Sequence, residues 1–276
     1  MLIDILKSIF LGIIEGITEW LPISSTGHMI LVDEFLKLNV SESFMEMFLV
    51  VVQLGAIMAV VLLYFKKLLP FDFKDKKIVV KKDTFSMWFK ILVACVPAAV
   101  IGILFDEKID EYFYNFQTVA IALIVYGILF ILIEKNNKNK LPALNEMDDI
   151  SYKTALIIGV FQLLAAVIPG TSRSGATILG GIMIGMSRTL AAEFTFFLAV
   201  PVMFGASLLK ILKFGFAFST TELLILVSGL VSAFVMSVIA IKFLIGYIKK
   251  HSFSAFGVYR IVLGSIVLLY WVTRIL

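Results

Sequence analysis

Long apolar runs separated by short polar segments dominate the chain. Two regions, 2–38 and 152–187, each hold two half-length apolar runs around a break rich in Pro, Gly, Ser and Thr. Each predicts a re-entrant helical hairpin, because non-helical backbone at membrane depth must be buried in protein or line a water-filled cavity. Six other runs approach the roughly 20 residues that a transmembrane helix needs. These six runs are 44–65, 85–105, 116–133, 194–212, 223–241 and 253–272.

The composition supports an all-α polytopic membrane protein rather than a water-soluble one. Apolar residues make up 61% of the 276 positions and charged residues only 16%, against roughly 45–50% and about 25% in soluble domains. The single cysteine, Cys95, lies in an apolar run, which excludes a disulfide framework and a thiolate metal cluster. The net charge of +4 does not indicate nucleic-acid binding, because the lysines gather at the ends of apolar runs.

The distribution of lysine predicts the orientation of the chain. The loop 66–83 carries seven lysines against three aspartates, which places it in the cytoplasm by the positive-inside rule. Lysines also follow the run 116–133 and the run 223–241, whereas the loop around residues 106–111 is acidic. The alternation puts both termini on the outer side. The first apolar run lacks a small-residue cleavage site, so we do not interpret it as a removable signal peptide.

The two polar breaks resemble each other, which predicts an inverted-topology repeat within one membrane domain, 1–276. The first hairpin enters from outside and the second from inside, as in proteins whose site lies at a repeat interface. We expect repeat one at about 1–134, a cytoplasmic linker at 135–149 and repeat two at about 150–276. Overlaying 12–25 on 159–172, an offset of 147, pairs Gly12 with Gly159, Glu15 with Gln162, Pro22 with Pro169, Ser24 with Thr171 and Ser25 with Ser172.

The first break carries two acids and a run of hydroxyl groups. Glu15 and Glu19 lie four residues apart and therefore on one helix face, where two carboxylates repel each other. A divalent cation or a shared proton would relieve the repulsion. Alternatively, they are a structurally satisfied pair of buried acids. Helix-capping hydroxyls follow before His28, at Ser24, Ser25 and Thr26.

The second break has the composition of an anion site. Glycines, hydroxyls and Arg173 directly precede an apolar helix, so that backbone N–H groups, a positive dipole end and a guanidinium group converge. Phosphate is the ligand that this pattern favours. In the alternative interpretation, Arg173 only neutralises Glu15 or Glu19. The expected phosphate-binding residues are Gly170, Thr171, Ser172, Arg173, Ser174 and Thr177 here, with Ser24 and Thr26 from the first break.

Together the two breaks predict hydrolysis of a phosphoanhydride. A cation on Glu15 and Glu19, together with Arg173, would neutralise the transferring phosphoryl group. The nucleophile is either an activated water or the Ser25 hydroxyl, with His28 as general acid or base. The sequence does not choose between them. The other histidine, His251, follows two lysines at a cytoplasmic end, which argues against a two-histidine mechanism.

At these residues the chain resembles the undecaprenyl-diphosphate phosphatases, a family once named for bacitracin resistance. The two motifs that carry the resemblance are 15–28 and 169–174, and the likeness extends over nearly the whole chain. It implies cleavage of a C55 isoprenoid diphosphate at the outer face of a bacterial plasma membrane, with Mg²⁺ or Ca²⁺ as cofactor. The residues that match the family's functional set are Glu15, Glu19, Ser25, His28, Ser172, Arg173 and Thr177.

Two other functions remain as alternatives at this point. A polyprenyl-phosphate transporter would use the same anion pocket, because inverted repeats with broken helices are also a transporter architecture. The acid pair favours the enzyme, since a carrier of an anion gains little from carboxylates beside its substrate. A purely structural role would leave the intramembrane charges unexplained. We expect the lipid substrate and membrane lipids as partners, no nucleic acid, and a possible homodimer.

Overall fold

The computed structural model describes residues 1–74, 77–113 and 115–275; Lys76 of the basic loop lies outside them. Six of its helices are long and apolar enough to cross a membrane, and each contains most of one predicted span. The all-α polytopic prediction is therefore confirmed. These helices are α3 (Glu42–Leu63), α5 (Lys82–Phe113), α6 (Phe116–Asn137), α9 (Arg188–Phe214), α10 (Thr220–Ile248) and α11 (Ser254–Ile275).

The two predicted hairpin regions form pairs of shorter helices. The first pair is α1 (Leu2–Thr18) and α2 (Ser25–Phe35), and the second is α7 (Tyr152–Val167) and α8 (Arg173–Met183). None reaches the roughly 20 residues that a membrane crossing requires. The remaining elements are α4 (Phe65–Leu68), η1 (Met147–Asp149) and an unexpected antiparallel pair, β1 (Phe71–Lys74) and β2 (Lys77–Val80), in the basic loop.

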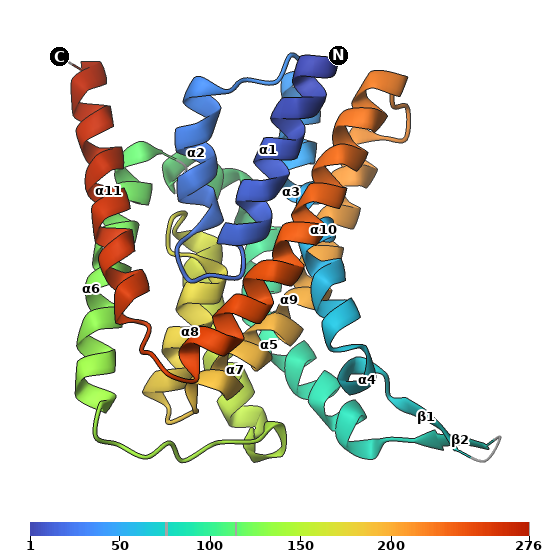
Figure 1. Cartoon of the computed structure of the whole chain (residues 1–276), viewed down its shortest axis with the longest axis vertical. Helices are drawn as coiled ribbons and strands as arrows, with labels where there is room; N and C mark the ends of the chain where they lie inside the picture. The colour runs from blue at the N-terminus through green and yellow to red at the C-terminus, as the bar shows by residue number, and fades with distance from the viewer. Residues whose placement is uncertain (75–76, 114, 276) are drawn as a thin grey trace.

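The two hairpins approach the centre of the molecule from opposite ends. In Figure 1 the pair α1–α2 descends from the end where both chain termini lie, and the pair α7–α8 rises from the end where β1 and β2 project. Both turns therefore lie at mid-height, where the second hairpin contacts the first. The inverted-topology repeat and its boundaries stay a prediction.

Helices from the two halves of the chain interleave rather than pack separately. Helix α1 packs against α10, and its counterpart α7 packs against α5; likewise α3 contacts α10 and α9 contacts α5. The pairs α3–α9 and α6–α11 join the halves directly. Close approach depends on small residues, because a Cβ atom on Gly12 would collide with the backbone of Gly229, and one on Gly159 with that of Ala94.

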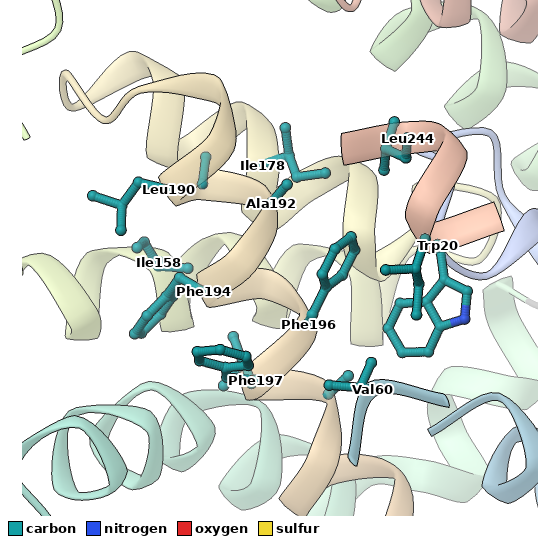
Figure 2. Close-up of a cluster of buried hydrophobic side chains, with 14 of the residues drawn as sticks. Trp20, Val60, Ile158, Ile178, Leu190, Ala192, Phe194, Phe196, Phe197 and Leu244 are labelled. Carbon is teal, nitrogen blue, oxygen red and sulfur yellow. The ribbon is translucent and has the colours of Figure 1, made fainter. Parts of the chain in front are cut away.

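The interior around the two turns is a dense aromatic and aliphatic core. Figure 2 shows Phe194, Phe196 and Phe197 projecting from α9 among side chains of several other elements. Trp20, in the first break, packs edge-on against Phe196 with ring centroids 5.2 Å apart. Both residues are fully buried. The turn is therefore fixed by packing, since a rigid core holds polar groups in place more precisely than a solvated loop does.

Candidate active site at the two helix breaks

A serine with unusual backbone geometry begins the second helix of each hairpin. Ser24 has φ 72° and Ser172 has φ 70°; among the residues described, they alone combine a positive φ with a side chain. Each hydroxyl caps its helix by accepting from a glycine N–H three residues later, at 3.3 Å from Gly27 and 3.1 Å from Gly175. A positive φ is energetically unfavourable for a residue that has a side chain, so the surrounding structure must hold each serine in this conformation.

The matching turns correct the predicted alignment of the breaks. The sequence overlay used an offset of 147 and paired Ser24 with Thr171, but the structurally equivalent residue is Ser172, at an offset of 148. The overlay was wrong at this point because it matched Pro22 with Pro169, whereas the cap geometry depends on the distance from serine to glycine. In the corrected register Ser25 stands where Arg173 does.

Glu19 connects the two breaks. Arg173 Nη2 donates to Glu19 Oε1 at 2.9 Å, and the side chains are only 13% and 7% exposed. Ser25 donates to the other carboxylate oxygen at 2.8 Å, and the Ser174 hydroxyl donates to the Glu19 backbone carbonyl at 2.9 Å. Arg173 Nη1 is held by the Thr195 carbonyl at 3.0 Å. The neutralising ion pair considered as an alternative is therefore present.

Glu15 lies one helical turn before Glu19 and is almost completely buried. Its carboxyl group shares a helix face with that of Glu19, where two negative charges would repel each other. Glu15 Oε1 has no hydrogen-bond partner, and neither has the buried Arg173 Nε. A buried acceptor and a buried donor left unpaired are costly, so both atoms are available to hydrogen-bond or coordinate a bound group.

His28 lies at the end of the first turn of α2, but no hydrogen bond joins it to Ser25 in the described part of the chain. Its Nδ1 donates to the Ser24 carbonyl at 2.7 Å, and its Nε2 lies 2.7 Å from the Tyr259 hydroxyl of α11. Tyr259 was not predicted, and a half-exposed tyrosine in an apolar run gives no signal of a role.

The remaining predicted phosphate-binding residues lie at the two turns, apart from Thr177. Ser172 and Ser174 line the second turn, with their hydroxyls 3.2 Å apart, and Thr26 lies half-buried in the first turn of α2. Gly170 and Thr171 belong to the turn backbone.

Thr177 points elsewhere, into the protein. Its hydroxyl lies 2.8 Å from that of Thr195 and donates to the Arg173 carbonyl at 2.9 Å. Thr177 therefore stabilises the backbone at Arg173. Because its hydroxyl is already hydrogen-bonded, it has little freedom to bind a ligand.

The sequence interpretation missed Arg260, the most deeply buried cation near the breaks. Its guanidinium donates to the carbonyls of Pro22 at 3.3 Å and Gly170 at 2.9 Å, so it ties one turn to the other. It also lies over the Tyr126 ring, 5.7 Å from the centroid. A signal existed, because Arg260 is the one ionisable Asp, Glu, Lys or Arg in the predicted span 253–272.

The acids fit a divalent cation only in part. No cluster of three or more His, Cys, Asp or Glu side chains suited to a metal occurs among the described residues. Glu15 offers an unpaired carboxylate oxygen, whereas both oxygens of Glu19 are already engaged. Two carboxylates suffice for Mg²⁺ when substrate phosphate completes the coordination. The residues therefore fit a cation that binds together with a phosphate group.

A separate cavity of about 460 Å³ lies at the basic-loop end of the molecule. None of the predicted site residues lines it, and its carboxylates would repel a phosphate group. The candidate site therefore remains at the breaks. The lining consists of Lys67, Asp83, Thr84, Met87, Asn145, Glu146, Met147, Asp148, Thr189, Leu190, Glu193 and Phe197.

The fold and the site together define a class: a multi-pass helical membrane protein that places carboxylates, hydroxyls and a guanidinium between two hairpin turns. Comparison with known sequences narrows this class. The family described as bacitracin resistance protein BacA matches residues 8–266. The chain belongs to the BacA family.

Relatives of similar length support this assignment. An undecaprenyl-diphosphatase of Acetivibrio thermocellus is 66% identical over 270 residues, which cover 98% of each chain. One of Desulfitobacterium hafniense is 66% identical over 273 residues, 99% of this chain and 98% of the relative. One of Enterococcus faecalis is 63% identical over 268 residues, 97% of each chain.

Proposed function

We propose that this protein hydrolyses undecaprenyl diphosphate to undecaprenyl phosphate and inorganic phosphate, which recycles the carrier lipid of cell-wall synthesis and confers bacitracin resistance. The observation that carries the proposal is the contact between Arg173 and Glu19 across the two breaks. It places a guanidinium, two acids and two helix N-termini around one point. The full-length relatives named undecaprenyl-diphosphatase support it and do not favour the transporter.

Substrate binding would begin with an exchange at Arg173. In the free protein the Glu19 carboxylate accepts a hydrogen bond from Arg173 Nη2, while Arg173 Nε is buried without a partner. A diphosphate oxygen can take the place of the Glu19 carboxylate, and a second oxygen can accept from Nε, because a guanidinium group binds phosphate with two parallel hydrogen bonds. The N-terminus of α8 adds a favourable dipole. Binding therefore separates the ion pair and releases Glu19.

The released carboxylate and its neighbour would hold the divalent cation. Glu15 contributes an unpaired oxygen, and Glu19 contributes the oxygen that Arg173 relinquishes. When bound, Mg²⁺ or Ca²⁺ supplies positive charge against the phosphoryl oxygens during transfer. Binding of both ligands at one place explains why two carboxylates suffice.

Ser25 and Glu19 together present an activated hydroxyl or position a water. The Ser25 hydroxyl donates to Glu19 Oε2 at 2.8 Å, so the carboxylate can accept its proton as the oxygen attacks phosphorus. In the water mechanism the same carboxylate accepts a proton from water instead. In either case the bond between the terminal phosphorus and the bridging oxygen breaks, and undecaprenyl phosphate leaves with that oxygen. In the serine route a water then hydrolyses the phosphoserine, so one water is consumed for each phosphate released in both routes. His28 would act on a later proton transfer, since it does not contact Ser25 directly.

The cellular setting follows from the charge pattern of the loops. The lysine-rich end that contains β1 and β2 would face the cytoplasm, so the α1–α2 hairpin and both termini would face outward in the bacterial plasma membrane. The site would then open to the outer side. Large exposed apolar side chains along the spans would contact membrane lipids and offer a surface on which a second copy of the chain can pack.

Phosphate release from undecaprenyl diphosphate by the purified protein tests the proposal. We expect release that stops when a chelator removes divalent cations and when both acids are changed, in Glu15→Ala/Glu19→Ala. A matched control is Glu193→Ala, which removes an acid that pairs with Lys67 at 2.9 Å at the lysine-rich end of the molecule. A monodisperse, folded wild type that releases no phosphate with Mg²⁺ or Ca²⁺ would refute the function.

A further inference from the structure

We propose that Tyr259 is a positioning residue for His28: its hydroxyl group sets the protonation pattern and orientation of the imidazole. The proposal rests on the proposed phosphatase function for its kinetic consequence, but its geometric part stands independently. Tyr259 belongs to α11, more than 200 residues away from His28 in the chain. Only the tertiary structure brings the two side chains together.

The hydrogen bonds around His28 assign its tautomer. A backbone carbonyl can only accept, so Nδ1, 2.7 Å from the Ser24 carbonyl, must carry a proton. In a neutral imidazole Nε2 is then an acceptor, and the Tyr259 hydroxyl at 2.7 Å is its donor. Both ring nitrogens are thus satisfied, and Nε2 is kept unprotonated and ready to receive a proton.

Ring geometry restricts the imidazole further. The His28 and Tyr259 rings lie 7° from parallel with centroids 5.6 Å apart, so the tyrosine limits rotation of the histidine as well as bonding it. The accepting carbonyl belongs to Ser24, which caps α2 from its constrained positive-φ conformation. His28 is therefore held between the first turn of the site and α11.

Position in α11 links this contact to the two breaks. Tyr259 immediately precedes Arg260, whose guanidinium donates to carbonyls in both breaks. Any shift of α11 that moved Tyr259 would also move Arg260. The tyrosine is consequently anchored at its backbone by a fully buried neighbour, although its own side chain is partly exposed.

The chain contains a natural control pair. Tyr247 and His251 also lie ring against ring, 17° from parallel with centroids 4.5 Å apart, but at the lysine-rich end. There the imidazole bonds the Tyr247 backbone carbonyl rather than the tyrosine hydroxyl. Tyr247→Phe therefore removes a hydroxyl from a comparable stack without removing a hydrogen bond to histidine.

The first test is spectroscopic and needs no activity. Because the chain has two histidines, His251→Asn leaves His28 as the only imidazole that ¹⁵N-histidine labelling reports. In this background we expect the Nδ1-protonated tautomer, and we expect Tyr259→Phe to shift the Nε2 resonance by removing its donor. Tyr247→Phe, made in the chain that keeps both histidines, should leave the His251 resonances unchanged, because that imidazole bonds the Tyr247 backbone carbonyl. An Nε2-protonated tautomer, or an Nε2 resonance that Tyr259→Phe does not move, would overturn the proposal.

The second test is a double-mutant cycle on phosphate release. Tyr259→Phe keeps the ring, so a role in binding the lipid tail would survive, whereas loss of positioning should lower kcat about tenfold with KM nearly unchanged. In the His28→Ala background the same substitution should change kcat by less than about twofold. Equal effects in both backgrounds, or a change confined to KM, would contradict positioning. No release from the wild type would instead refute the phosphatase function, and the spectroscopic test would still decide the tyrosine's role.

Discussion

The two helix breaks share one backbone turn but carry opposite charges. Ser24 and Ser172 adopt nearly the same φ and cap their helices through glycines at the same spacing. The first turn follows two acids, whereas the second is followed at once by Arg173. The same serine-capped turn therefore lies beside negative side chains in one half of the chain and a positive side chain in the other.

Their difference explains why the site needs both breaks. A helix N-terminus favours anions whatever its side chains are, so both turns offer a favourable dipole to an anion. Only the second adds a guanidinium fork, and only the first adds carboxylates that can bind a cation or accept a proton. In the free protein these opposite charges satisfy each other through Arg173 and Glu19.

The largest effect is expected when the guanidinium group of the second break is removed. Arg173→Ala should lower phosphate release by at least about 10²-fold, because the fork that opposes the phosphoryl charge is lost. Arg173→Lys should restore a minor part, since an ammonium group lacks the paired donors. Steady-state release with a folded-protein check by size-exclusion chromatography measures both. Turnover near that of the wild type in Arg173→Ala would place the phosphate elsewhere.

Removing the negative charge of Glu19 in the first break should lower phosphate release less than removing Arg173 does. The loss should also depend on the cation concentration. Glu19→Gln keeps the shape of the side chain but weakens cation binding, so we expect about tenfold lower release at limiting Mg²⁺ and partial recovery at high Mg²⁺. Titration of activity with Mg²⁺ and with Ca²⁺ measures the shift. Glu193→Gln serves as the matched control. An unchanged titration curve for Glu19→Gln would assign the cation to other groups.

Glycine substitutions should separate the two turns by stability. Gly170→Ala should lower the free energy of unfolding by about 2 kcal/mol or more, because Gly170 has φ 89° and a Cβ atom would lie 2.7 Å from the Val119 carbonyl oxygen. Gly27→Ala should cost about 1 kcal/mol or less, since the nearest atom to its Cβ would be the flexible end of the Leu123 side chain at 3.1 Å. Thermal unfolding in detergent compares the variants; equal losses would contradict the asymmetry.

Removing the caps should show how similar the turns are. Ser24→Ala and Ser172→Ala each lose one hydrogen bond to a backbone N–H, and each should cost about 1 kcal/mol. Ser24→Gly and Ser172→Gly should cost less, because glycine adopts a positive φ without strain. The same thermal unfolding experiment checks all four. Alanine variants that are as stable as the glycine variants would show that the positive φ carries no strain.

Much of this architecture could be predicted from the sequence. The six spans follow from run length alone, because a bilayer imposes a minimum on each crossing helix. The breaks follow from Pro, Gly, Ser and Thr within apolar surroundings, and their charges marked Glu15, Glu19 and Arg173 as site candidates. These signals are local or concern one segment, so each could be interpreted without knowing its neighbours.

The sequence was less informative where two segments had to be placed against each other. The alignment of the breaks was wrong by one residue, because proline matched proline while the cap depends on backbone angles. One of the two predicted mechanisms used Ser25 as nucleophile with His28 as general acid or base, yet in the structure Ser25 bonds Glu19 and His28 bonds Tyr259. Spacing within one segment does not reveal which distant helix supplies the nearest partner.

The sequence by itself determined a multi-pass helical membrane protein, its two interrupted hairpins and the chemical groups they carry, because hydrophobic length and buried charge impose their requirements residue by residue. The tertiary structure decided how those groups are paired. It joined Arg173 to Glu19, tied both turns to Arg260 and placed Tyr259 on His28. These contacts arise because helices of one half pack between helices of the other, and that interleaving is a property of the folded chain as a whole.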